Sequence, residues 1–169
     1  MSIQQAPVMD FEAELAALTD LAQMLRSRGW RLATAESCTG GLIAAACTSV
    51  AGSSDWFERG FVTYSNAAKT ELLGVDPDLI ASQGAVSEAV AAAMVRGALQ
   101  RAPVQLAVAV TGIAGPGGAM PGKPVGTVWL AWGTASDVHT ELLQLPGDRT
   151  AVRAATLTQA LQRLAAFVP

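Results

Sequence analysis

Short apolar runs and amphipathic segments alternate along the chain, and this alternation limits the fold more than any other feature of the sequence. Continuous apolar runs bounded by turn residues predict buried strands at 30–37 (WRLATAES) and 105–112 (QLAVAVTG). Residues 56–65 (WFERGFVTYS) also have strand composition. Residues 125–132 and 137–145 predict two further strands, which the tight turn GTAS joins into a hairpin.

Apolar residues spaced three and four apart predict the helices that separate these strands. The first, at 11–29, ends in Gly29, a residue type that often stops a helix. The others are predicted at 39–50, at 66–73, in the short segment before Gly84, after the cap residue Ser87, and at 147–167.

Strands that alternate with helices and end in a hairpin indicate an α/β fold with three layers, α/β/α. We expect a mixed, mostly parallel sheet with one antiparallel member. The length of 169 residues suits one domain. The sequence therefore predicts a flexible N-terminal lead at 1–10 and a single domain at 11–169.

The composition is that of a folded protein without a strongly charged surface. Hydrophobic residues make up 51 % of the sequence, and the net charge of −3 argues against nucleic acid or acidic lipid as a partner. No window reaches the ~20 mostly apolar residues that span a bilayer. The first ten residues also lack the pattern of a signal peptide. We expect a cytoplasmic protein that binds neither nucleic acid nor membranes.

The sequence offers no recognisable transition-metal site. Cys38 and Cys47 lie on one predicted helix, roughly 13 Å apart, and cannot easily pair. His139 is the one histidine, and the chain has no Cys-x-x-Cys or His-x-x-x-His spacing. We therefore expect a mechanism that needs no metal ion and a His139 that is simply solvated.

The turn AESCTGG joins a predicted strand to a predicted helix. Ser37 and Thr39 stand where a helix N-cap is expected, and Gly40-Gly41 allows close approach of the backbone. The same kind of turn exposes a nucleophile, with the unpaired N–H groups of the first helical turn available to an oxyanion. The local sequence leaves Ser37 as either a cap or a nucleophile, with Cys38 as a weaker candidate nucleophile.

A nucleophilic serine needs a base, and the polar strand that contains His139 is a poor place for one. Lys69, in TYSNAAK, falls about one turn into the helix that Asn66 would cap, and Tyr64 ends the preceding strand. The polar ends of Tyr64 and Lys69 could therefore converge. A lysine is a base only where burial or cations lower its pKa, and the alternative is a solvated lysine paired with Glu71.

The loop TGIAGPGG has the glycine density of a phosphate-binding segment. It is not a P-loop, because Pro124 follows Lys123 where Ser or Thr is required and a strand comes next. It is not a dinucleotide fingerprint, because Met120 stands at the last glycine position. Arg149, at the start of the last helix, could bind a phosphate or pair with a surface acid.

Taken together, AESCTGG, AGSSDWFERGFVTYSNAAKTELLGV, GAVSE, VTGIAGPGG, KPVGTVW and GDR resemble the C-terminal domain family of the competence/damage-inducible protein CinA. The resemblance spans 21–167 and implies a three-layer α/β/α domain with a five-stranded mixed sheet. Family members that act alone resemble nicotinamide-nucleotide amidase, which hydrolyses the carboxamide of nicotinamide mononucleotide to nicotinate mononucleotide and ammonia. The resemblance thus implies an amidohydrolase of pyridine nucleotide salvage that needs no cofactor.

The same resemblance implies a role for individual residues. Ser37 would be the nucleophile, and Tyr64 and Lys69 would assist proton transfer. Backbone N–H groups around Thr39-Gly40-Gly41 would bind the oxyanion. Contacts with the nucleotide substrate are expected from Glu36, Thr39, Gly40, Gly41, Asn66, Thr111, Gly112, Gly115 and Arg149.

Two other functions stay open. The first is a non-catalytic nucleotide-binding accessory module, because some family members are fused to another domain and a fold does not guarantee activity. The second is an amidase with a different preferred nucleotide. The resemblance also favours a homo-oligomer, with a dimer first, and Trp56 and Phe57 would lie either in a subunit contact or in the core.

Overall fold

The computed structural model describes residues 11–168, so the predicted lead at 1–10 lies outside the described residues. Within this range one five-stranded sheet has the strand order β2-β1-β3-β4-β5. Its strands are β1 (Leu32–Glu36), β2 (Phe57–Val62), β3 (Leu106–Gly112), β4 (Thr127–Gly133) and β5 (Val138–Gln144).

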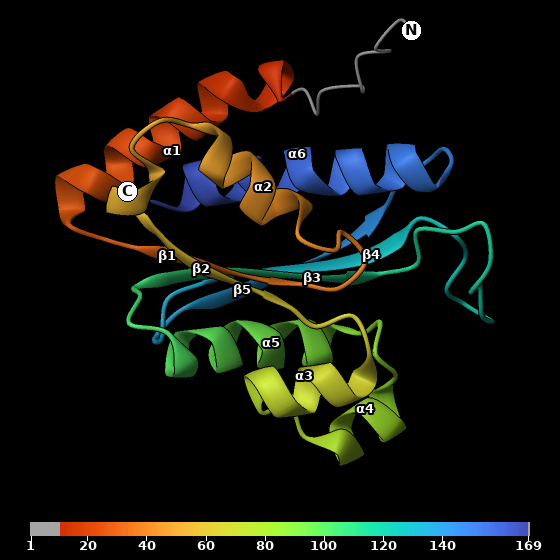
Figure 1. The fold of residues 1–169 in the computed structure, drawn as a ribbon. Helices are drawn as coiled ribbons and strands as arrows, with labels where there is room; N and C mark the ends of the chain where they lie inside the picture. Colours follow the sequence, from red (N-terminus) through yellow and green to blue (C-terminus); the bar gives the residue numbers. More distant parts are fainter. Residues whose placement is uncertain (1–10, 169) are drawn as a thin grey trace, which may run out of the picture.

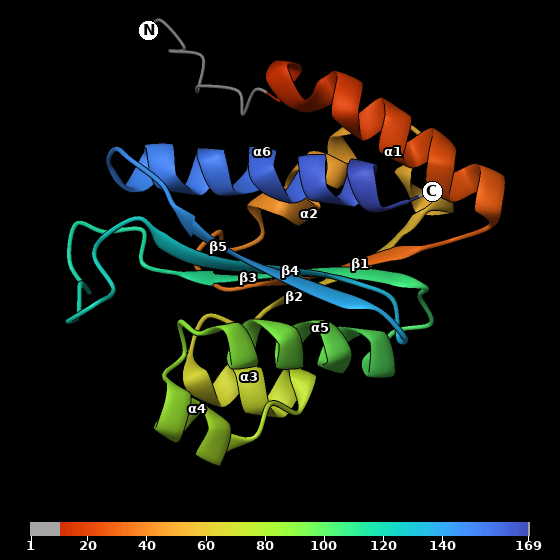
Figure 2. The same cartoon turned by 180° about the vertical axis from the view of Figure 1, so that it is seen from behind.

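Helices cover both faces of the sheet, as the two opposite views show (Figure 1, Figure 2). One face carries α1 (Leu15–Arg28), α2 (Leu42–Ser49) and α6 (Arg149–Phe167). The other carries α3 (Asn66–Leu73), α4 (Pro77–Gln83) and α5 (Glu88–Arg101). Two short 3₁₀ turns, Glu12–Glu14 and Ser53–Asp55, precede α1 and β2. The predicted three-layer α/β/α architecture is confirmed.

The pairing of the strands sets where the loops meet. β1 pairs in parallel with both β2 and β3, whereas β4 is antiparallel to β3 and β5. Among the described strands β4 alone therefore runs against the others, as predicted. Glu36, at the end of β1, is in register with Val62 of β2 and Val110 of β3. The loops that follow these three strands consequently leave the same edge of the sheet.

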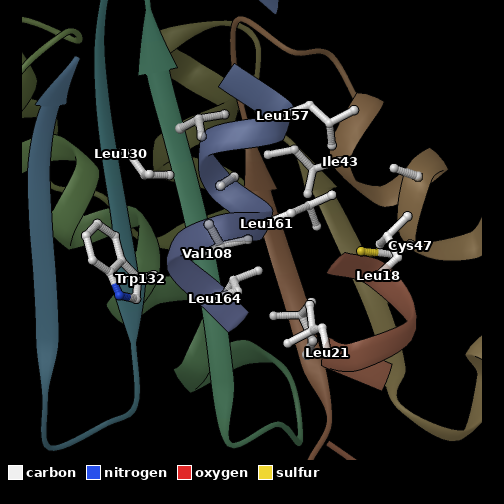
Figure 3. Packing of buried hydrophobic residues seen from close by; sticks show 14 of the residues in the cluster. Leu18, Leu21, Ile43, Cys47, Val108, Leu130, Trp132, Leu157, Leu161 and Leu164 are labelled. Carbon is white, nitrogen blue, oxygen red and sulfur yellow. The ribbon is translucent and has the colours of Figure 1, made fainter. Parts of the chain in front are cut away.

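Alternation along the central strands divides the core into two clusters. In β3, Leu106 and Val108 face the cluster with α1 and α6, whereas Ala107 and Ala109 face α5. Figure 3 shows the α6 leucines packed over Val108. Trp56 is fully buried in the same cluster, so it is a core residue rather than an exposed contact. Each such large side chain contributes about 1.5–3 kcal/mol through its burial.

The cap of α3 fixes the position of Lys69. The prediction that Asn66 caps this helix is wrong, because the Ser65 hydroxyl accepts a hydrogen bond from the Ala68 N–H at 3.0 Å and Asn66 is already helical. The Lys69 N–H donates to the Ser65 carbonyl, so Lys69 lies one turn into α3. The predicted cap of α5 is confirmed, since Ser87 accepts from the Val90 N–H.

Gly97 is the point where α5 passes closest to the end of α3. A Cβ at this position would overlap the carbonyl oxygen of Leu73. We expect Gly97→Ala to lower the free energy of unfolding by about 1–3 kcal/mol in a urea titration, although alanine normally favours a helix by about 1 kcal/mol. Gly117→Ala is the control, because no atom lies within 4 Å of a Cβ at Gly117. Equal stability of the two variants would contradict this interpretation.

Candidate active site

A cavity of about 240 Å³ opens beside the ends of β1, β2 and β3. This is the edge where ligands bind in open α/β sheets. The loops after β1 and β2, the start of α3, the end of β3 and the first residue of α6 all contribute to it. Its walls are formed by Ser37, Cys38, Tyr64, Asn66, Lys69, Ala85, Val86, Thr111, Gly112, Ala114 and Arg149.

Ser37 and Lys69 meet at the bottom of this cavity. The Lys69 Nζ lies 2.9 Å from the Ser37 Oγ. Ser37 directly follows β1, and Lys69 lies on α3, the helix that follows the neighbouring parallel strand β2. Lys69 is 1 % exposed and Ser37 is 8 % exposed. Lys69 is therefore not the solvated, ion-paired lysine that was the alternative. Ser37 is not a helix cap either, because Gly41 occupies the N-cap of α2 without a side-chain hydrogen bond.

The described contacts of Lys69 are with uncharged oxygen atoms. Besides Ser37, its Nζ lies 2.8 Å from the Thr63 carbonyl oxygen and 3.5 Å from the Tyr64 carbonyl oxygen. Burial lowers the pKa of Lys69 below its ordinary 10.5, and no described carboxylate forms an ion pair with it. A neutral amine can donate to both carbonyls and direct its lone pair at the Ser37 hydroxyl. The geometry therefore allows Lys69 to accept the serine proton.

Cys38 lies beside Ser37 but is poorly suited to attack. The side chain is 6 % exposed, and its burial raises the pKa of the thiol to about 11. Only the thiolate is an effective nucleophile, and a thiol with this pKa stays protonated near neutrality. The environment therefore favours the hydroxyl of Ser37 over the thiol of Cys38.

The structure places Glu36 in the protein interior rather than where a substrate contact was expected. Its buried carboxylate accepts hydrogen bonds from the Thr39 hydroxyl (2.7 Å) and from the N–H groups of Gly41 (3.1 Å), Ile43 (3.0 Å) and Ala44 (2.8 Å). It thereby satisfies the free N–H groups and the positive end of α2. Glu36 does not line the cavity, so it is placed to support residues 37–41, the nucleophile turn, rather than to bind substrate.

The backbone of the nucleophile turn, residues 37–41, leaves few donors free. Gly40 and Gly41 both have positive φ, which suits glycine, but their N–H groups donate to the Ser37 carbonyl and to Glu36. The Ser37 N–H is also used, by the Val110 carbonyl. Within the part of the chain that the structure describes, the Cys38 and Thr39 N–H groups donate to no other residue. The expected oxyanion donors therefore shift from Thr39-Gly40-Gly41 toward Cys38 and Thr39.

Arg149 organises the rim of the cavity. Its Nη1 donates to the Gly115 carbonyl oxygen and its Nη2 donates to the Tyr64 hydroxyl, both at 2.9 Å. The Tyr64 hydroxyl thus contacts Arg149, and the contact between Lys69 and Tyr64 is with the Tyr64 carbonyl oxygen and not with the hydroxyl. Gly115 does not line the cavity and contributes through this carbonyl. The expected convergence of the phenol and the lysine amine is not what the structure shows.

Of the remaining residues considered in the sequence, three line the cavity and His139 does not. Asn66, Thr111 and Gly112 line the cavity, and the Thr111 hydroxyl donates to the Ala85 carbonyl oxygen at 2.8 Å, which fixes the opposite wall. His139 lies outside the cavity and pairs with a nearby aspartate on the surface.

No group of three or more His, Cys, Asp or Glu side chains among residues 11–168 could hold a metal ion. In the same range no helix has the length and apolarity to cross a bilayer.

Comparison with known proteins identifies relatives that share most of the chain. A family model described as the CinA C-terminal domain matches residues 14–168. The nicotinamide-nucleotide amidohydrolase PncC of Pseudomonas putida is 56 % identical over 146 residues, covering 86 % of this chain and 91 % of that protein. The protein of the same name from Escherichia coli (strain K12) is 50 % identical over 155 residues, covering 90 % and 94 %.

The fold is also found among solved structures. A competence-damaged protein (CinA) superfamily protein from Klebsiella pneumoniae superposes with a TM-score of 0.87 and is 40 % identical in sequence. The superposition covers 90 % of this chain and 96 % of that one. Sequence and three-dimensional structure therefore point to the same relatives.

Proposed function

The chain belongs to the CinA C-terminal domain family, and we propose that it hydrolyses the carboxamide of nicotinamide mononucleotide to nicotinate mononucleotide and ammonia. The observation that carries the proposal is the buried contact between Ser37 and Lys69 at the bottom of the cavity. Burial lowers the pKa of Lys69, and once this lysine has lost its proton the pair consists of a nucleophile and its base, which acyl transfer requires. The names of the two relatives supply the substrate class.

In the proposed reaction Ser37 attacks the carboxamide carbon and Lys69 takes the hydroxyl proton. The tetrahedral intermediate then collapses, the C–N bond breaks, and Lys69 returns the proton so that ammonia leaves. The nucleotide remains joined to Ser37 as an ester. Water attacks this ester while Lys69 takes a proton from it, and Lys69 passes this proton to the Ser37 oxygen as the acid is released, which restores the serine hydroxyl. Each proton that Lys69 accepts is returned within the same half-reaction.

The negative oxygen of the tetrahedral intermediate needs hydrogen-bond donors close to Ser37. The N–H groups of Cys38 and Thr39 follow the nucleophile directly and are not used by another described residue. We assign the oxyanion site to these two groups. Each such donor typically contributes about 3–4 kcal/mol to the stabilisation of the transition state.

The rim of the cavity suits the rest of the nucleotide. Arg149 donates hydrogen bonds within the protein through Nη1 and Nη2. Its positive charge also lines the cavity, together with Tyr64, Asn66 and Thr111. We propose that these four residues contact the ribose and phosphate. The Tyr64 hydroxyl accepts a hydrogen bond from Arg149 at the rim of the cavity. Its assistance in proton transfer stays a prediction.

Product analysis tests the function against its alternatives. The protein is incubated with nicotinamide mononucleotide, with the dinucleotide and with nicotinamide, and ammonia and the acid product are measured. We expect stoichiometric release of ammonia and nicotinate mononucleotide, fastest from the mononucleotide. An accessory binding module would saturate with nucleotide and leave it unchanged.

The predicted homo-oligomer, with a dimer favoured, is tested separately by sedimentation equilibrium.

A further inference from the structure

Arg153, which lies far from the nucleophile turn in sequence, contacts this turn through its guanidinium. Arg153 lies on α6, one helical turn after Arg149, and its Nη2 donates a hydrogen bond of 2.9 Å to the Thr39 carbonyl oxygen. Gly40 presents no side chain to this guanidinium, and a Cβ there would have Arg153 as its nearest neighbour at 4.0 Å. Two arginines of α6 therefore hold the site, Arg149 at the rim and Arg153 at the turn.

Thr39 is fixed at two atoms by this arrangement. Its hydroxyl donates to Glu36 at 2.7 Å and its carbonyl accepts from Arg153, while the residue itself is fully buried. The N–H group is the polar group of Thr39 that no described residue uses. The side chain and carbonyl of Thr39 fix its Cα, which is one end of the Cys38–Thr39 peptide that carries this N–H, and the hydrogen bond from the Ser37 N–H to Val110 anchors the turn before it. Anchors on both sides restrict the direction of the N–H, which is the condition for a preorganised oxyanion site.

No carboxylate of the described residues is directly paired with Arg153. None of their ion pairs includes Arg153. Its field nevertheless reaches the nucleophile turn: burial raises the pKa of the Cys38 thiol, the Glu36 charge adds to this rise, and the charges of Lys69 and Arg153 oppose it. The charge of Arg153 therefore offsets part of the negative charge of Glu36 next to Ser37, where the oxyanion develops.

We propose that Arg153 is a positioning residue, which holds the Thr39 carbonyl and thereby the nucleophile turn, so that the Cys38 and Thr39 N–H groups face the developing oxyanion. The inference rests on the proposed function for the reaction, but the contact on which it depends is the same for any amide or ester. Since the oxyanion exists only in the transition state and the intermediate, loss of Arg153 affects turnover rather than substrate affinity.

Steady-state kinetics with three variants tests this role. We expect Arg153→Met to lower kcat for nicotinamide mononucleotide about 10- to 100-fold and to change KM less than about 3-fold. Arg153→Lys should recover part of kcat, because it keeps the charge and one donor. Arg163→Met is the matched control on the same helix; it loses only the pair with Glu141 and should keep kcat within about 2-fold. An effect of Arg153→Met on KM alone would overturn the proposal.

A boronate separates this inference from the choice of substrate. 3-Pyridineboronic acid forms a tetrahedral adduct with a nucleophilic serine, and one boronate oxygen takes the oxyanion position. We expect Arg153→Met to weaken its binding at least about 10-fold in a calorimetric titration, with thermal midpoints of the variants compared alongside.

The outcomes distinguish two failures. If boronate binding falls in Arg153→Met while the parent protein releases no ammonia from nicotinamide mononucleotide, the substrate is wrong and the positioning role stands. If the parent protein is an amidase and Arg153→Met behaves like Arg163→Met in both assays, the positioning role is wrong and the function stands. A parent protein that neither hydrolyses the nucleotide nor binds the boronate contradicts both.

Discussion

Replacing Ser37 by alanine is expected to lower the rate of ammonia release from nicotinamide mononucleotide by at least about 10³-fold. The alanine side chain cannot form the ester, and Lys69 then has no hydroxyl from which to take a proton. Binding should persist, because Arg149 and the other residues proposed to contact the ribose and phosphate are unchanged. Calorimetry of the variant with the substrate therefore measures its affinity without turnover.

Ser82→Ala is the matched control for this variant. Ser82 lies exposed on α4 and its hydroxyl donates only to the Leu79 carbonyl of its own helix. The control should keep the parental rate. If Ser37→Ala also kept it, the assignment of the nucleophile would be wrong and Cys38, beside it in the cavity, would be the next group to replace.

Replacing Lys69 by methionine is expected to lower kcat by about 10²–10⁴-fold, the usual contribution of a positioned base, with little change in KM. In the parent protein kcat should rise with pH as Lys69 loses its proton. The midpoint should lie below 10.5, since burial lowers the pKa of this amine. Lys69→Arg should also be inactive, because a guanidinium stays protonated.

Lys123→Met is the control for the loss of a lysine. Lys123 lies on the loop after β3 and donates to the Gln83 carbonyl oxygen outside the cavity, so its loss should leave kcat unchanged. A rise of KM with constant kcat in Lys69→Met would instead make Lys69 a binding residue. A kcat independent of pH in the parent protein would show that Lys69 does not titrate during turnover.

The same pKa shift has a consequence for stability. The pKa of Lys69 is lower in the folded protein than its unfolded value of 10.5, so between these two values the unfolded chain binds more protons. The free energy of unfolding of the parent protein should therefore rise with pH across this window, relative to Lys69→Met. Urea titrations of both proteins at a series of alkaline pH values measure this difference.

Much of the fold follows from local sequence patterns. The boundaries predicted for α3 and the Ser87 cap of α5 agree with the structure, because apolar spacing and capping residues act within a few positions of the chain. The mixed sheet was also predicted from the alternation of elements and the final hairpin. The strand order β2-β1-β3 could not be predicted, since it depends on long-range packing that no local pattern encodes.

The site was predictable in part. The sequence named Ser37 and Lys69, but their contact depends on β1 and β2 being neighbours in parallel register. It missed the role of Glu36, although a carboxylate at the end of a buried strand, just before a helix with free N–H groups, was a usable signal. Arg153 gave no signal, because an arginine on an amphipathic helix normally faces solvent.

The central claim is that Ser37 forms an acyl-enzyme, and partitioning between two nucleophiles tests it most directly. The parent protein is given nicotinamide mononucleotide or the methyl ester of nicotinate mononucleotide, each with hydroxylamine in water. If both substrates pass through the same ester on Ser37, the ratio of hydroxamate to acid is identical for the two. If water attacks the substrate directly, the ratio differs between the amide and the ester, and this result would contradict the mechanism.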